Sequence, residues 1–140
     1  MFTSMDISTS GMVAQRARLN AISGNLANMS TTHNEAGQAA PYQPRFVVFQ
    51  ADDAVAETTG AMGVKVSSVE IAAADPLWKY QPGHPDAIKE GERQGYVAYP
   101  NIDMTTEMVD ALEATRAYEA NIGVMEISKS MAAQTLKIIA

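Results

Sequence analysis

The feature that most constrains this chain is a long apolar repeat in its C-terminal part. Apolar residues recur there in alternating steps of three and four, and the stretch contains no proline. The positions are Met108, Ala111, Thr115, Tyr118, Ile122, Met125, Lys129, Ala132, Leu136 and Ile139. All but Thr115 and Lys129 are apolar. This spacing predicts a coiled-coil seam on an amphipathic helix of about 36 residues, roughly 54 Å long.

The charges at the two ends of this segment support a helix. Asp103 follows Pro100 and Asn101 and is expected to cap the N-terminus. Acidic residues gather in the first half and Lys129 and Lys137 lie late, an order that complements the helix dipole. Because helical stability comes mainly from tertiary packing, a seam this long needs partner helices.

A second amphipathic helix is expected over residues 6–28. Met5, Met12, Leu19 and Leu26 recur every seventh residue, and Ile22 adds a second apolar position. We expect Asp6 or Ser8 to cap this helix and Asn28 to end it. The helix is a candidate partner for the C-terminal seam, with Arg16 and Arg18 facing the acidic half. The rest of the seam would need other subunits.

The middle of the chain has a different pattern. Residues 35–100 hold all six prolines, and short strand-like runs at 45–50, 64–71, 77–80 and 96–99 lie between turn signals. A bulge near Ser67 or Ser68 would bring Val64 and Val66 into phase with Val69 and Ile71. We therefore predict an α+β fold with three parts: an N-terminal assembly helix (1–34), a small β-rich domain (35–100) and a C-terminal assembly helix (101–140).

Composition and motifs argue against most chemical functions. The net charge is −6 with no basic run, which disfavours nucleic-acid binding, and cysteine is absent. No phosphate-binding loop or nucleophile elbow is present. His33 and His84 are expected to be solvated loop residues, and the Asp52–Asp53 pair to serve solubility. We predict no catalytic residue, metal, cofactor or small-molecule substrate.

Two further features bear on binding and on location. Trp78 and Tyr80 alternate on one predicted strand, where core packing is favoured over a binding platform. The N-terminus shows no secretory signal and no stretch is apolar enough to span a bilayer. These signals alone indicate a cytoplasmic protein, although a secretion route that uses no such signal would escape them.

Several motifs resemble those of one family. Residues 10–28 read SGMVAQRARLNAISGNLAN, which resembles the AQ–RLN–NLAN motif shared by flagellar rod and hook proteins. Residues 96–103, YVAYPNID, resemble the GYVxxPNVD segment of C-type proximal-rod proteins, and residues 107–109 and 116–121 resemble their EMV and RxYxAN patterns. The resemblance covers nearly the whole chain.

This resemblance implies a structural subunit of the flagellar proximal rod, part of the basal-body driveshaft for motility. Such a subunit would polymerise through its terminal helices, with copies of itself and neighbouring rod proteins as partners. It would reach the periplasm through the flagellar type III export apparatus without a cleaved signal peptide. The expected assembly interface comprises Gln15, Arg18, Leu19, Asn20, Ile22, Asn25, Leu26, Asn28, Met108, Ala111, Arg116, Tyr118, Asn121, Ile122, Met125 and Leu136.

Alternatives remain open at this point. Asn20, Asn25 and Asn28 are poor helix formers, and they either bond neighbouring chains or only end the helix. The whole chain could instead be an export adaptor whose helices clasp a partner and which stays in the cytoplasm. An enzyme, such as a wall hydrolase, would need a cleft with carboxylates in distinct environments, and no such pattern is found. If the chain is a rod subunit, both of its ends are expected to be poorly ordered before assembly.

Overall fold

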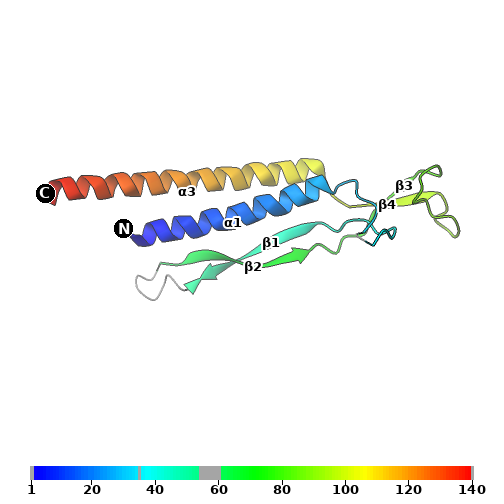
Figure 1. Cartoon of the computed structure of the whole chain (residues 1–140), viewed down its shortest axis with the longest axis horizontal. Helices are drawn as coiled ribbons and strands as arrows, with labels where there is room; N and C mark the ends of the chain where they lie inside the picture. The colour runs from blue at the N-terminus through cyan, green and yellow to red at the C-terminus, as the bar shows by residue number, and fades with distance from the viewer. Residues whose placement is uncertain (1, 35, 54–60, 140) are drawn as a thin grey trace.

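The computed structural model describes residues 2–34, 36–53 and 61–139. Two long helices, α1 (Phe2–Ala27) and α3 (Met104–Ile139), enclose two antiparallel β-hairpins in the chain order. The helices run side by side in opposite directions, so the start of α1 and the end of α3 lie at the same end (Figure 1). The expected α+β class with long terminal helices is confirmed.

The start of α1 differs from the prediction. The helix begins at Phe2, so Asp6 and Ser8 lie inside it and neither is its cap. Ser8 is buried, and the hydroxyls of Thr9 and Ser10 donate back to the carbonyls of Met5 and Ile7 at 2.8 and 2.7 Å. Short polar side chains can thus be satisfied by backbone carbonyls within a helix, so their presence does not by itself mark a helix start.

Asn28 ends α1 as expected. Its backbone N–H donates to the Gly24 carbonyl at 3.1 Å, and its side-chain Nδ2 donates to the same oxygen at 2.9 Å. The side-chain Oδ1 accepts from Thr31 Oγ1 at 3.1 Å. The side-chain amide thus adds a second hydrogen bond to a carbonyl of the last turn and fixes the chain as it leaves the helix.

The start of α3 is as predicted. The Asp103 carboxylate accepts from the backbone N–H groups of Thr105 and Thr106 at 3.2 and 3.3 Å, and from the Thr106 hydroxyl at 2.6 Å. The hydrogen bond from the Thr106 hydroxyl, followed by that from the Thr105 N–H, lowers the pKa of Asp103 below its ordinary value. The helix has 36 residues.

The first hairpin pairs β1 (Arg45–Asp52) with β2 (Gly63–Ile71). Val48 pairs with Ser68 and Phe49 pairs with Val66, so Ser67 is the extra residue of a bulge. The predicted bulge is confirmed. Both strands run slightly into the expected loop at 52–63, whose residues 54–60 lie outside the described residues.

The second hairpin pairs β3 (Leu77–Tyr80) with β4 (Tyr96–Tyr99). Core packing of Trp78 and Tyr80 is not observed. Tyr80 is 64% exposed, and the Trp78 ring lies under the Arg93 guanidinium carbon at 4.4 Å. The fully buried side chain of this hairpin is Val97. A sheet of only two strands is too small to form a core of its own. Trp78 is therefore only half-buried and Tyr80 is exposed.

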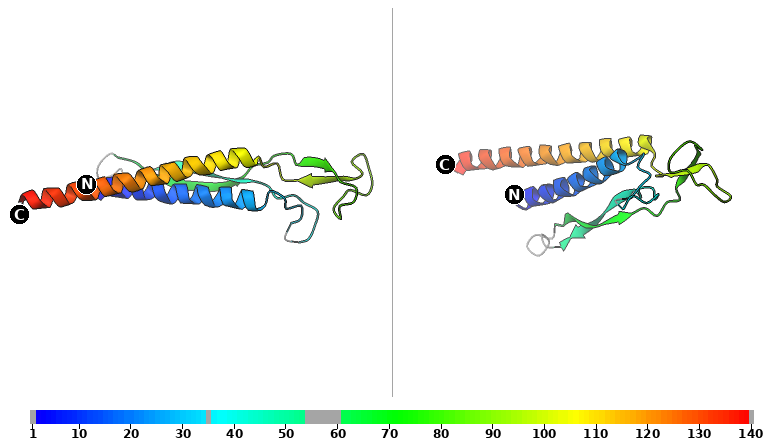
Figure 2. Two further views of the ribbon diagram at one scale, coloured as in Figure 1. Left: turned by 90° about the horizontal axis from the view of Figure 1, so that it is seen from above. Right: turned by 45° about the vertical axis from the view of Figure 1, so that its right-hand side comes forward.

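The elements form three layers. In Figure 1, α1 lies between α3 and the β1–β2 hairpin, and the turned views of Figure 2 agree. The β3–β4 hairpin, called the distal arm here, projects from the end opposite the termini. The buried apolar side chains of the described residues are Ala14, Ile22, Val97 and Ala114. This core is thin, and α1 is the middle layer, with α3 on one side and the β1–β2 hairpin on the other.

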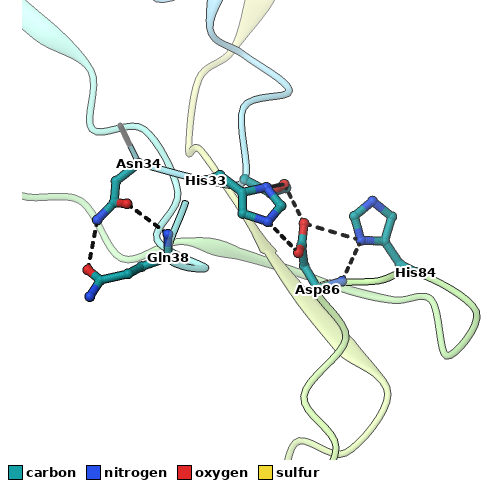
Figure 3. Close-up of polar contacts among 6 residues, drawn as sticks. His33, Asn34, Gln38, His84 and Asp86 are labelled. Carbon is teal, nitrogen blue, oxygen red and sulfur yellow. Dashed lines mark hydrogen bonds and ion pairs between the residues drawn. The ribbon is translucent and has the colours of Figure 1, made fainter. Parts of the chain in front are cut away.

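The two histidines lie in loops, as expected, but they are not separate. Both contact the carboxylate of Asp86 (Figure 3). His33 Nε2 lies 2.7 Å from one oxygen, and His84 Nδ1 lies 3.5 Å from the other. Sequence spacing gave no sign of this meeting, because it depends on a loop after α1 folding against the loop of the distal arm.

Candidate assembly surface

Small side chains let α1 and α3 approach closely. Ala14 and Ala114 are 1% and 0% exposed. A Cβ atom on Gly11 would lie 3.0 Å from Nδ2 of Asn121, so the glycine admits that side chain. Asn121 Nδ2 in turn donates to the Ala117 carbonyl at 2.8 Å. The predicted pairing of the two terminal helices is therefore present within one chain.

The buried stripe of α1 agrees with the predicted one only at Ile22. Met5, Met12, Leu19 and Leu26 are only half-buried. The buried positions are Ser8, Ala14, Ile22 and Asn25. The seventh-residue repeat thus indicates the helix correctly and its contact face only approximately, because small and polar residues occupy the closest contacts.

Ion pairs tie the middle of α1 to the acidic start of α3. Arg18 Nη2 lies 3.4 Å from Asp110 Oδ1 and 3.2 Å from Glu113 Oε2. The prediction that Arg18 faces the acidic half of the C-terminal helix is confirmed. Arg16 is exposed and borders a hollow with Tyr118, so it does not share that role.

Asn25 joins three elements at the end of the helical pair. Its Nδ2 donates to the Arg45 carbonyl at 2.9 Å and to Glu107 Oε1 at 3.1 Å. Its Oδ1 accepts from the Arg45 N–H at 2.8 Å and from the Tyr42 hydroxyl at 3.3 Å. The side chain is 3% exposed. Every hydrogen-bonding site of this amide is used inside the chain.

Glu107 carries a perturbed charge beside this amide. Desolvation by burial raises the pKa of Glu107 above its ordinary value, with the nearby Asp110 adding to the rise. The hydrogen bond from Asn25 acts in the opposite direction. The start of α3 is therefore a place where burial works against a carboxylate, and Asn25 offsets part of that cost.

Gln15 has an unsatisfied hydrogen-bond acceptor in the helical pair. Its Oε1 is buried and has no hydrogen-bond partner among the described residues. A buried acceptor without a donor is costly, so this oxygen weakens the packing of α1 against α3.

The structure divides the expected interface residues by exposure. Ile22 and Asn25 are buried. The half-buried ones are Gln15, Arg18, Leu19, Leu26, Asn28, Ala111, Tyr118, Asn121 and Met125. The exposed ones are Asn20, Met108, Arg116, Ile122 and Leu136. The exposed set is free to contact another chain, and the interface itself remains a prediction.

A second apolar stripe on α3 was missed. Val109, Val124, Ile127, Met131 and Ile138 are all exposed, and we call them the outer stripe. Most follow steps of three, four or seven, the same signal as the predicted seam but shifted around the helix. A search for two stripes instead of one would have found it.

The side of the helical pair also carries an apolar groove. Met5 and Met12 of α1 face Ile122 and Met125 of α3 across a volume of about 340 Å³. Glu126 and Lys129 stand at its border. Flexible methionine side chains suit contacts with non-identical neighbours.

Chemical sites are not evident in the part of the chain that the structure describes. No group of three or more His, Asp or Glu residues there is arranged to hold a metal ion. None of the helices in the same ranges combines the length and apolar character needed to cross a membrane. The prominent features are surfaces, not reactive clusters.

Comparison with known proteins agrees with this picture. Residues 5–33 match the family described as flagella basal body rod protein, and residues 93–138 match the flagellar basal body rod FlgEFG protein C-terminal family. The chain is similar to the flagellar basal-body rod protein FlgC of Salmonella typhimurium, with 43% identity over 133 residues, 95% of this chain and 93% of the relative.

Two more distant relatives cover even more of the chain. The flagellar basal-body rod protein FlgC of Borreliella burgdorferi is 37% identical over 151 residues, 99% of this chain and 97% of its own length. That of Bacillus subtilis is 36% identical over 149 residues, covering 98% and 97%. The similarity therefore includes the middle hairpins as well as both helices.

Proposed function

The chain belongs to the family of the flagellar basal-body rod protein FlgC, and from that membership we infer that it is built into the rod through its terminal helices. It is a structural subunit of the flagellar basal body and not an enzyme. Its partners are other flagellar rod proteins, itself included. The adaptor and hydrolase alternatives are thereby set aside.

One observation carries the assembly mechanism: the outer stripe of α3 is uncovered. Ile127 is 63% exposed, Met131 is 57% and Ile138 is 84%. Contiguous exposed apolar surface on a folded chain is typical of a protein–protein contact. Burial of such side chains is worth about 1.5–3 kcal/mol each.

The lengths of the helices add to this argument. With 26 residues against 36, α1 is about 15 Å shorter than α3. The Ser4 and Ser128 hydroxyls lie 3.5 Å apart, so the last turns of α3 run past the start of α1 (Figure 1). Leu136 and Ile138 lie in those turns and are exposed. Neighbouring subunits would complete the packing there.

The layering suggests which side faces inward in the rod. The β1–β2 hairpin packs against α1 (Figure 2). The outer stripe of α3 is exposed. We propose that α1 and α3 form the inner tubular layer and that the two hairpins lie outside it. The expected interface residues on both helices belong to this proposal.

A charge placed in the outer stripe tests the mechanism. Ile127→Asp is expected to leave the helical content of the free subunit unchanged, because Ile127 is exposed. It should remove the subunit from purified basal bodies and abolish swimming. Gln94→Asp is the control, since it adds the same charge at an exposed position in the loop of the distal arm, outside both helices. Normal rods with Ile127→Asp would overturn the proposal.

The finer location follows the same family membership. We propose that the subunit lies in the proximal rod, in the periplasm, and arrives through the flagellar type III export apparatus with its N-terminus intact. The mass of the subunit extracted from basal bodies should equal that of the uncleaved chain, and cells without the export apparatus should retain it in the cytoplasm. A shortened N-terminus would contradict this route.

A further inference from the structure

The Asp86 carboxylate holds two loops together at the base of the distal arm. Its side chain is 8% exposed. Thr32 Oγ1 donates to Oδ2 at 2.8 Å, and His33 Nε2 lies 2.7 Å from Oδ1 (Figure 3). Thr32 and His33 follow α1, whereas His84 and Asp86 lie between β3 and β4. The four residues Thr32, His33, His84 and Asp86 are called the clasp below.

The hydrogen bonds of the clasp determine where its protons sit. The single hydroxyl proton of Thr32 is given to Asp86, so its oxygen must accept at the 3.3 Å contact with His33 Nδ1. His33 therefore donates from Nδ1 to Thr32 and from Nε2 to Asp86. An imidazole that donates from both nitrogens is the charged form.

His84 has the opposite state. The backbone N–H of Asp86 donates to His84 Nδ1 at 3.2 Å. That nitrogen must carry a lone pair, so His84 is neutral with its proton on Nε2. The clasp thus pairs one imidazolium with one buried carboxylate. Among the described residues, the titratable groups that meet His33 and Asp86 are each other and His84.

We propose that the clasp is a proton-dependent lock on the distal arm, closed when His33 is doubly protonated. Histidine is the side chain whose charge ordinarily changes between about pH 5 and 8. When His33 loses a proton, Nδ1 becomes an acceptor and competes with Asp86 for the Thr32 hydroxyl. The buried carboxylate then loses its counter-charge, which is costly. The arm is held in mildly acidic solution and loosens as the pH rises.

The apolar contact that docks the distal arm beside the clasp is small, so a change in the clasp affects the docking. A cavity of about 80 Å³ separates Thr32 and Ala39 from Trp78 and Val97, and Asp86 borders it. Neither strand of the arm packs extensively against a helix. The docking of the arm therefore depends on this small apolar contact and on the clasp.

Trp78 gives a direct readout, because it is the only tryptophan of the chain and borders that cavity. We expect its fluorescence in the full chain to show one transition between pH 5 and 8. His33→Gln should abolish the transition. His84→Gln, the matched control in the facing loop, should retain it. A flat profile for the unsubstituted chain, or an unchanged transition in His33→Gln, would overturn the proposal.

Imidazole ¹⁵N chemical shifts of the unsubstituted chain test the proton assignment without any variant. Below the midpoint of the fluorescence transition, both His33 nitrogens should be protonated. A His33 ring with one protonated nitrogen throughout this range would refute the lock. A transition that disappears with His84→Gln instead would do the same.

Discussion

At the scale of single residues, Asn25 is the most connected side chain of the described structure. Asn25→Ala would leave Glu107, the Tyr42 hydroxyl and both backbone groups of Arg45 without this amide. Loss of a buried hydrogen-bonding partner costs about 1–3 kcal/mol, so we expect the free energy of unfolding to fall by about 2–3 kcal/mol. Urea denaturation followed by circular dichroism measures this.

The control for this prediction is Asn20→Ala on the same helix, where the asparagine is exposed. It should change the free energy of unfolding by less than about 0.5 kcal/mol. Equal effects of the two substitutions would show that the Asn25 amide is not a structural centre. The assembly role expected for Asn25 stays a prediction, and in this structure any such role acts through the position of α1 relative to α3.

Glu107 gives a prediction for pH. Because its pKa is raised in the folded chain, the folded state binds this proton more tightly than the unfolded state does. The associated stability is fully present below the ordinary pKa of 4.5 and is lost as the pH rises through the raised pKa. Glu107→Gln keeps an acceptor for Asn25 without a charge, so it should stabilise the chain at pH 7.

The gain from Glu107→Gln should shrink toward pH 4, where the glutamate is itself protonated. Chemical denaturation at both pH values measures the difference. Glu119→Gln, exposed on the same helix, is the control and should show no such trend. A Glu107→Gln variant that is less stable than the parent at pH 7 would contradict the burial argument.

At the scale of elements, the sequence predicted which helices and strands exist better than it predicted how they pack against one another. Local geometry is enough to predict three features that the structure has: the C-terminal helix, its cap at Asp103 and the bulge near Ser67. The buried face of α1 and the meeting of His33 with His84 depend on distant segments. A periodicity measured along one helix contains no information about which neighbour covers it.

Substitution of one glycine in each helix tests the contact between α1 and α3 directly. A Cβ on Gly123 of α3 would meet nothing within 4 Å, whereas one on Gly11 of α1 would press on Asn121. Gly123→Ala should stabilise the free subunit by about 0.5–1 kcal/mol through helix propensity alone.

Gly11→Ala gains the same propensity but must displace the Asn121 amide from its bond to Ala117. We expect it to be less stable than Gly123→Ala by about 1 kcal/mol. Thermal denaturation of both variants provides the comparison. Equal stabilisation by the two alanines would mean that the close approach at Gly11 is absent in solution.

At the scale of the whole molecule, the exposed surface is too large for a self-sufficient monomer. The chain of 15.0 kDa exposes 9589 Å². A compact monomer of this mass would expose about 7,000 Å². The excess of about 2,500 Å² is comparable to the area buried in obligate subunit contacts. An elongated shape with one thin core accounts for it (Figure 1).

This excess predicts that the terminal helices are only marginally stable before assembly. Their pairing in the free subunit should open often, so amide hydrogen exchange at low concentration should be much faster across α1 and α3 than in the same helices after incorporation into rods. The strand pairing of Val97 with Lys79 provides an internal reference whose protection should change little.

Chain segments that fold on binding meet their ordering cost only when partners are present, which would prevent polymerisation before export. Strong protection of both helices in the free subunit would show that the packing of α1 against α3 already suffices. The uncovered outer stripe would then be a docking surface on a preformed helical pair, and assembly would require no folding step.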